Sequence, residues 1–164
     1  MTGLLGAATY VEGVMKAASA GLFSMLPAII FIVACLLAFA TGTSWGTFGI
    51  LIPIVLPIFK VGDPLLMIGI SACLAGAVCG DHCSPISDTT IMASAGANCN
   101  HIEHVQTQLP YAVTVALISF VNFIIAGFVK NAWICLPIGI VMTIVVLFIL
   151  RSTVGKRTSV AAEK

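Results

Sequence analysis

Charged residues are scarce in this chain. Only 13 of its 164 residues are Lys, Arg, Asp or Glu, about 8%, where a soluble domain carries roughly a quarter. Five of these 13 lie after position 150. With 60% hydrophobic residues and a mean hydropathy of +1.15, the chain has too little polar surface for a water-soluble globule. This scarcity excludes a soluble enzyme, a disordered chain and a basic nucleic-acid-binding protein, and it indicates an integral membrane protein.

A disulfide framework and a strong net charge are absent as well. The six cysteines lie mostly inside apolar runs, where a cysteine usually serves as a small buried side chain. The net charge of +1 creates no strong field for an anionic partner. No basic segment precedes the first apolar stretch, so no cleavable signal is expected. The expected partner is therefore the lipid bilayer and no nucleic acid.

The uncharged stretch at residues 17–59 is longer than one membrane crossing. As a helix, its 43 residues would extend about 64 Å, twice a hydrocarbon core of roughly 30 Å, so the chain must cross and turn back. We expect the first crossing at residues 22–40, after a short helix at residues 4–20. The return segment, residues 48–59, has only 12 residues and contains two prolines, which favours a re-entrant or broken segment.

The remaining chain alternates between apolar and polar segments. These are an interfacial turn at 60–64, an apolar run at 65–78, a polar stretch at 80–90, an apolar run at 91–97, a surface loop at 98–109, and plain crossings at 110–129 and 132–150. We expect an all-α polytopic helical bundle with discontinuous spans, in which residues 1–150 form a membrane domain of four to five elements. Four Lys or Arg in the tail, residues 151–164, predict a cytoplasmic C-terminus.

Asp81 and Asp88 are the only charged residues with long apolar sequence on both sides. In the membrane centre each would cost at least ~2.5–3.5 kcal/mol, so we expect them to line a polar cavity. Between them, Pro85 removes a backbone N–H and pushes Ser84 away from the helical conformation. We expect an unwound segment between two half-helices, near mid-membrane, where freed carbonyls, both carboxylates and nearby hydroxyls converge. The hydroxyls are those of Ser84, Ser87, Thr89 and Thr90.

Such a set of oxygens suits a hard cation such as sodium. Burial favours the protonated carboxylate and a bound cation favours the ionised one, so sodium and a proton can compete for one group. Histidine ordinarily titrates near pH 6.5 (about the middle of the physiological range), so His82 either shares the proton exchange or packs as a neutral side chain. No cofactor is expected beyond the transported sodium ion and proton. No nucleophile–base arrangement is evident, so we do not expect an enzyme.

A second polar stretch at residues 41–47 is rich in glycines and hydroxyls. We expect it to form the opposite wall of the same cavity. The residues that would break the helix or supply neutral oxygens are Gly42, Gly46, Thr41, Thr43 and Ser44. The alternative is a tightly packed crossing, because small residues let membrane helices approach closely. For Asp81 and Asp88, the alternative is a structural polar network that stabilises the bundle.

A membrane metal site is a further alternative. Two trios supply soft ligands: Cys79, His82 and Cys83, and Cys99, His101 and His104. Neither trio has the paired C-x-x-C spacing of a strong zinc site. We expect His101 and His104 to lie on a solvated loop instead.

Two longer motifs carry most of this polar chemistry. They are GDHCSPISDTTIMASAG at residues 80–96 and ATGTSWGTFGILIPI at residues 40–54. In their order and spacing they resemble NhaC-type sodium/proton antiporters. The resemblance implies a multi-spanning prokaryotic transporter of the inner (plasma) membrane that exchanges sodium for protons or couples organic acids. It implies that the family's polar intramembrane segment corresponds to Asp81, His82, Ser84, Ser87, Asp88, Thr89 and Thr90.

The resemblance covers essentially the whole chain but only the C-terminal third of a usual family member. Four or five membrane elements seldom build both halves of an alternating-access transporter. We therefore expect either a homo-oligomer or a separately encoded N-terminal half as the partner. The alternative functions are a transport-silent truncated membrane protein and an organic-acid/cation exchanger of the same family.

Overall fold

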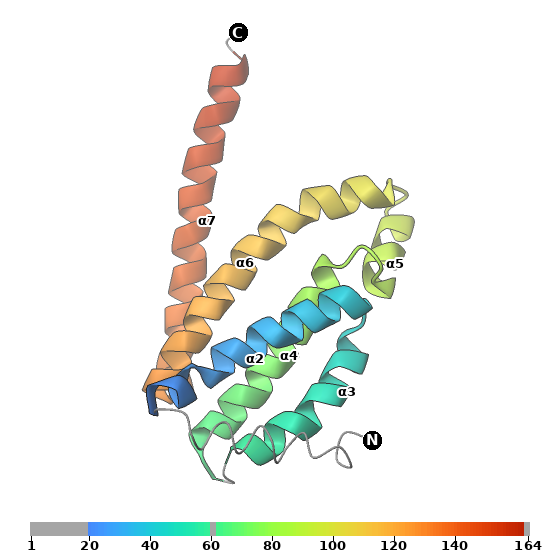
Figure 1. Cartoon of the computed structure of the whole chain (residues 1–164). Coiled ribbons are helices and arrows are strands. Elements are labelled where there is room, and N and C mark those ends of the chain that lie inside the picture. The colour runs from blue at the N-terminus through green and yellow to red at the C-terminus, as the bar shows by residue number, and fades with distance from the viewer. Residues whose placement is uncertain (1–19, 60–61, 163–164) are drawn as a thin grey trace.

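The computed structural model describes residues 20–59 and 62–162, and every regular element in these ranges is helical. In chain order these are α2 (Ala20–Thr41), α3 (Ser44–Val55), the 3-10 helix η1 (Leu56–Ile58), α4 (Pro64–Cys83), α5 (Asp88–Gly96), α6 (His101–Val129) and α7 (Ala132–Ala162) (Figure 1). Residues 4–19 of the helix predicted at 4–20, and the turn residue Lys60, lie outside the described residues, and Ala20 is the first residue of α2.

Within the part of the chain that the structure describes, four helical segments are long and apolar enough to cross a membrane. They are Phe23–Thr41, Pro64–Cys83, His101–Val129 and Ala132–Ser152. These segments correspond to the apolar runs of the sequence. They are helical because a segment that spans lipid must satisfy its own backbone hydrogen bonds. The predicted all-α, polytopic membrane fold is confirmed for the described chain.

The centre of the molecule is the contact between α2 and α4, which lie side by side (Figure 1). Gly76 and Gly80 stand four residues apart on α4, where a Cβ atom would overlap the backbone carbonyl oxygens of Phe31 and Cys35 on α2. Ala34 of α2 is fully buried in the same contact. Because lipid is as apolar as the side chains, close backbone packing at small residues is what holds such a pair together.

The other long helices pack around this pair. α6 contacts both α2 and α4, and α7 packs chiefly against α6 and projects beyond the other helices (Figure 1). α3 is too short to cross a membrane and lies against α4. A re-entrant path for this segment stays a prediction.

The predicted surface loop at residues 98–109 is wrong. α6 begins at His101, because the Asn100 side chain accepts hydrogen bonds from the N–H groups of Ile102 and Glu103 and caps the helix. The predicted crossing at 110–129 is therefore the C-terminal part of a helix of 29 residues, about 44 Å long. Pro110 lies inside it, which membrane helices tolerate.

Two other expected boundaries also differ. α7 does not end near residue 150 but continues to Ala162, through most of the basic tail. α4 is one continuous helix of 20 residues, about 30 Å, and is long enough to cross alone. The chain thus leaves the helix at the end of a span-length element and not in its middle, and the predicted discontinuous spans are not confirmed.

Candidate ion-binding site

The chain between Asp81 and Asp88 leaves the helical conformation around Pro85, where the sequence predicts a break. α4 ends at Cys83 and α5 begins at Asp88. Ser84 is extended, with φ −76° and ψ 129°, and its N–H bonds the Asp81 carbonyl at 3.0 Å. A residue before proline prefers this conformation, and the proline ring cannot supply the next helical N–H. Pro85 therefore ends the helix, as the sequence predicts.

Asp81 is the buried carboxylate of this break, with only 8% of its surface exposed. The Ser87 hydroxyl donates to Asp81 Oδ1 at 2.6 Å, and Ser87 is fully buried. Thr89 Oγ1 lies 2.7 Å from Ser87 Oγ. Because Ser87 gives its single hydroxyl proton to Asp81, Thr89 donates to Ser87. A chain of hydroxyls thus leads from the exposed Thr89 to the buried carboxylate.

The second polar stretch packs directly against this break. The Ser84 hydroxyl donates to the Phe39 carbonyl at the end of α2, at 2.8 Å. Gly42 follows with φ +67°, and a Cβ at this position would come within 2.9 Å of the Ile86 carbonyl oxygen. Glycine is required here for both the left-handed backbone and the close approach. The two stretches are thus in contact, and the prediction that they form opposite walls of one ion cavity stays a prediction.

Within the second stretch, the turn is shorter than predicted. α2 ends at Thr41, and Thr43 caps α3, its Oγ1 accepting the Gly46 N–H at 3.4 Å. Gly46 therefore lies inside α3, and the predicted helix break at Gly46 is wrong. Thr41 and Thr43 are exposed, whereas Ser44 is buried. Thr47, part of the predicted polar stretch but not one of its named oxygen donors, is also buried and donates to the Thr43 carbonyl at 2.8 Å.

Asp88 does not join the network of Asp81. It opens α5 with an exposed side chain that has no hydrogen bond within the described residues. Ser84 and Ser87 are extended and residues 85–86 form a turn, so Asp81 and Asp88 do not share one face of a continuous helix. The predicted convergence of the two carboxylates is not confirmed.

His82 is exposed at the end of α4, and its ring has no hydrogen-bond partner in the described part of the chain. With Gln108 and Tyr111 it lines a cavity of about 610 Å³ between α2, α4 and α6. Its backbone carbonyl accepts a hydrogen bond from Thr90 Oγ1 at 3.5 Å, and Thr90 is buried. The His82 ring is thus placed to face a cavity next to the break.

Two residues of α6 reach the break, and sequence reasoning missed both roles. Gln108 Nε2 donates to the His82 carbonyl at 2.6 Å, and His101 Nε2 lies 2.7 Å from the Pro85 carbonyl oxygen. The prediction that His101 lies on a solvated loop is therefore wrong. His104, by contrast, makes no side-chain hydrogen bond within residues 20–59 and 62–162. The sequence signal for these roles was the spacing of His101 and Gln108, two polar residues seven apart just before the apolar run of α6.

Neither cysteine–histidine trio forms a metal site. Among the described residues, no group of three or more His, Cys, Asp or Glu lies close enough to hold a metal ion.

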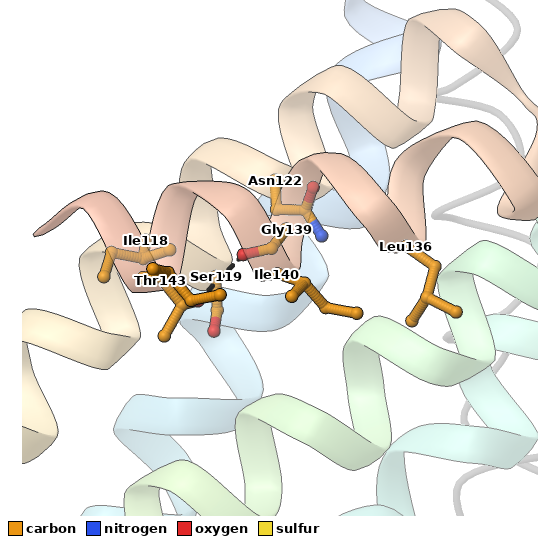
Figure 2. Close-up of a pocket in the computed structure, with 8 residues that line it drawn as sticks. Ile118, Ser119, Asn122, Leu136, Gly139, Ile140 and Thr143 are labelled. Carbon is orange, nitrogen blue, oxygen red and sulfur yellow. Dashed lines mark hydrogen bonds between the residues drawn. The ribbon is translucent and has the colours of Figure 1, made fainter. Parts of the chain in front are cut away.

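A second cavity, of about 370 Å³, lies between α6 and α7 and contains none of the residues of the break (Figure 2). Ser119 and Asn122 line it from α6, and Gly139 and Thr143 line it from α7. Asn122 Oδ1 is buried and has no hydrogen-bond partner within the described chain. The contact between α6 and α7 is therefore incompletely packed.

Curated relatives that match the chain include three bacterial proteins. An uncharacterized protein of Haemophilus influenzae is 52% identical over 75% of this chain and 24% of its own length. The malate-2H⁺/Na⁺-lactate antiporter of Bacillus subtilis is 35% identical over 59% of this chain and 21% of its own length. An uncharacterized Na⁺/H⁺ antiporter of Haemophilus influenzae is 32% identical over 65% of this chain and 24% of its own length.

The chain thus spans less than a quarter of the length of the curated relatives it matches. No solved structure matches it. The match to a family of proteins is broader, because it covers residues 2–128 and includes both polar stretches. The chain belongs to the Na⁺/H⁺ antiporter family.

Proposed function

We propose that the chain is the ion-binding part of a secondary active transporter that exchanges sodium for protons across the cell membrane, with Asp81 as the exchanging group. The observation that carries this proposal is the burial of Asp81 beside a neutral donor, the Ser87 hydroxyl at 2.6 Å. A buried carboxylate without a compensating charge binds either a proton or a cation. A sodium/proton antiporter alternates between these two states, one with a bound proton and one with a bound sodium ion.

The surrounding oxygens support a route for each ion. Sodium would take the Asp81 carboxylate together with the Ser87 hydroxyl oxygen, which are the hard ligands that such cations prefer. A proton would travel along the hydroxyls of Thr89 and Ser87, which already form a hydrogen-bonded chain to Asp81. Occupancy by one ion then lowers affinity for the other, because both require the same carboxylate.

The described helices supply only part of such a machine. Alternating access usually requires two repeats or bundles that move against each other, and the relatives are about four times longer than the matched segment. We propose that a second copy of this chain or a separately encoded N-terminal half completes the transporter. The four Lys or Arg after residue 150 favour a cytoplasmic C-terminus.

The exchange of Asp81 for asparagine tests the proposal. In inverted membrane vesicles, Asp81→Asn is expected to lower sodium-driven proton flux at least about 100-fold, because the amide neither ionises nor binds a cation with charge. Asp88→Asn is the matched control. Its exposed side chain lies outside the network, so more than half of the flux should remain.

Membrane insertion of both variants is checked by their yield in the vesicle fraction. Equal flux in wild type and Asp81→Asn would reject Asp81 as the exchanging group. Absence of flux in the wild type, with either proposed partner present, would instead support the transport-silent alternative.

Exchange of organic acids is a second candidate, favoured by the cavity beside His82. Its volume of about 610 Å³ is far larger than a sodium ion needs, and one relative is named for malate and lactate. Sodium-driven flux that depends on lactate or malate inside the vesicles would select this candidate over sodium/proton exchange alone.

A further inference from the structure

The end of α4 leaves backbone carbonyls without helical partners. The last carbonyls of any helix need other donors, and a break that contains proline leaves more of them. The His82 and Pro85 carbonyls are two such groups, one on each side of Ser84. Both receive a donor from α6: Gln108 Nε2 bonds the His82 oxygen at 2.6 Å, and His101 Nε2 bonds the Pro85 oxygen at 2.7 Å.

These two donors stand on one face of one helix. His101 and Gln108 are seven residues apart, about two helical turns, so their side chains project in nearly the same direction. The Asn100 cap fixes where this helix begins, and hence the register of both donors against the break. We call this pair, His101 and Gln108, the α6 clamp.

The imidazole of the clamp also contacts α5. His101 Nδ1 lies 3.0 Å from Ser94 Oγ, and the buried Ser94 hydroxyl lies 2.8 Å from the Ile91 carbonyl oxygen. The Pro85 carbonyl can only accept, so the Nε2 proton is committed to it. The contact between Nδ1 and the Ser94 hydroxyl oxygen joins the same ring to α5.

We propose that His101 and Gln108 are positioning residues that hold the broken segment in the geometry that binds the ion at Asp81. Pro85 lies between Ser84, which is tied to the Phe39 carbonyl, and Ser87, which donates to Asp81. Release of the Pro85 carbonyl frees the Ser87 side of the break to move away from the carboxylate. The consequence for ion affinity rests on the proposed function, whereas the clamp itself is measured without transport.

Hydrogen–deuterium exchange of the full chain in lipid nanodiscs measures the clamp. The amides of Ser84, Ser87 and Ile91 are bonded within the break, to the Asp81, Ser84 and Ser87 carbonyls. In His101→Ala and in Gln108→Ala, their exchange should be about tenfold faster, which corresponds to about 1.4 kcal/mol. The matched controls are His104→Ala and Gln106→Ala.

These controls lie in the same turns of α6, and neither side chain makes a hydrogen bond within the described residues. Their exchange at the break should equal that of the wild type. An equal increase in clamp and control variants would overturn the proposal, because it would report general loosening of α6. Unchanged exchange in both clamp variants would overturn it as well.

Two conservative variants separate hydrogen bonding from packing. Gln108→Glu has the same shape but lacks the N–H donor, so it should exchange as fast as Gln108→Ala. His101→Gln retains an N–H donor and should stay within about threefold of the wild type, well below the alanine variant. Wild-type exchange in Gln108→Glu would contradict the role of the donor.

The link to ion binding has its own measurement. In vesicles, the clamp variants should raise the sodium KM about tenfold and change the maximal flux less, because the ligands are displaced and not removed. A loosened break with an unchanged KM would overturn the positioning role. If the wild type carries no flux, the proposed function fails, and the exchange experiment still decides whether the clamp holds the break.

Discussion

Two pairs of helices in this chain meet in different ways. In the most apolar 18-residue stretch of each helix, the buried share is 39% in α2 and 44% in α4. It is only 11% in α6 and 6% in α7. Glycines bring the backbones of α2 and α4 into contact, whereas a cavity of about 370 Å³ lies between α6 and α7 (Figure 2). Beside this cavity, the buried Asn122 Oδ1 has no hydrogen-bond partner among the described residues. The family match, residues 2–128, includes the first pair and stops before α7.

The tight pair is also the one that carries the candidate site. Asp81 follows Gly80 directly on α4, and Phe39, whose carbonyl accepts from Ser84, lies at the end of α2. The backbone contact between these two helices therefore positions the break. An ion site needs ligands held within a fraction of an ångström, and close packing at small residues provides that rigidity. The α6/α7 pair carries none of the candidate ion ligands and so does not need this rigidity.

The largest effect is expected from a methyl group in the tight pair. In Gly80→Ala, the new Cβ would overlap the Cys35 carbonyl oxygen, a backbone atom that cannot move alone. We expect a loss of about 3 kcal/mol of unfolding free energy, or failure to fold. The midpoint of thermal unfolding in detergent measures it, followed through the reaction of the buried cysteines with a maleimide dye after the exposed Cys99 has been blocked.

Gly49→Ala is the control for this substitution. Gly49 lies inside α3, and a Cβ there meets nothing within 4 Å. Alanine is the better helix former by up to about 1 kcal/mol, so this variant should be as stable as the wild type or slightly more stable. Equal midpoints for Gly80→Ala and Gly49→Ala would show that the two backbones are not in contact.

The helices that form the tight pair were predictable because local composition decides them. Uncharged apolar runs specify the spanning segments, and Pro85 specifies where α4 must stop, whatever it packs against. The prediction failed at residues 98–109, where polar side chains were interpreted as a loop. A capped helix can carry polar turns beyond the membrane core, and the Asn100 cap was the overlooked local signal.

The details of the site depended on contacts that are distant in sequence. Asp81 and Asp88 have similar local surroundings in the sequence, yet only Asp81 is buried. That difference arises from the packing of α2 and α6 on the break, through the Phe39 carbonyl and the donors of His101 and Gln108. No pattern within residues 80–96 contains this information, so the ranking of the two carboxylates required the structure.

A smaller effect is expected where a hydrogen bond joins the tight pair to the break. Ser84→Ala removes the donor to the Phe39 carbonyl at a fully buried position. We expect a loss of about 1–1.5 kcal/mol, seen as a lower unfolding midpoint, because the Phe39 carbonyl loses its hydrogen-bond partner in a part-buried contact. Ser71→Ala is the control, since the Ser71 hydroxyl bonds a carbonyl within its own helix at an exposed site. A similar shift of the unfolding midpoint in both variants would show that the hydrogen bond from Ser84 to Phe39 does not stabilise the contact between α2 and the break.

The smallest effect is expected in the loose pair, from Gly139→Ala. The new Cβ would lie 2.9 Å from Asn122 Nδ2, the far end of a side chain that borders a cavity and can move into it. Relief of the contact by rotation of the amide, together with the better helix propensity of alanine, should keep the change in unfolding free energy within about 0.5 kcal/mol. The same thermal midpoint measures it, with Gly80→Ala as the reference for an immovable neighbour. A loss as large as that of Gly80→Ala would mean that α6 and α7 are packed as tightly as α2 and α4, and the contrast between the two pairs would then be wrong.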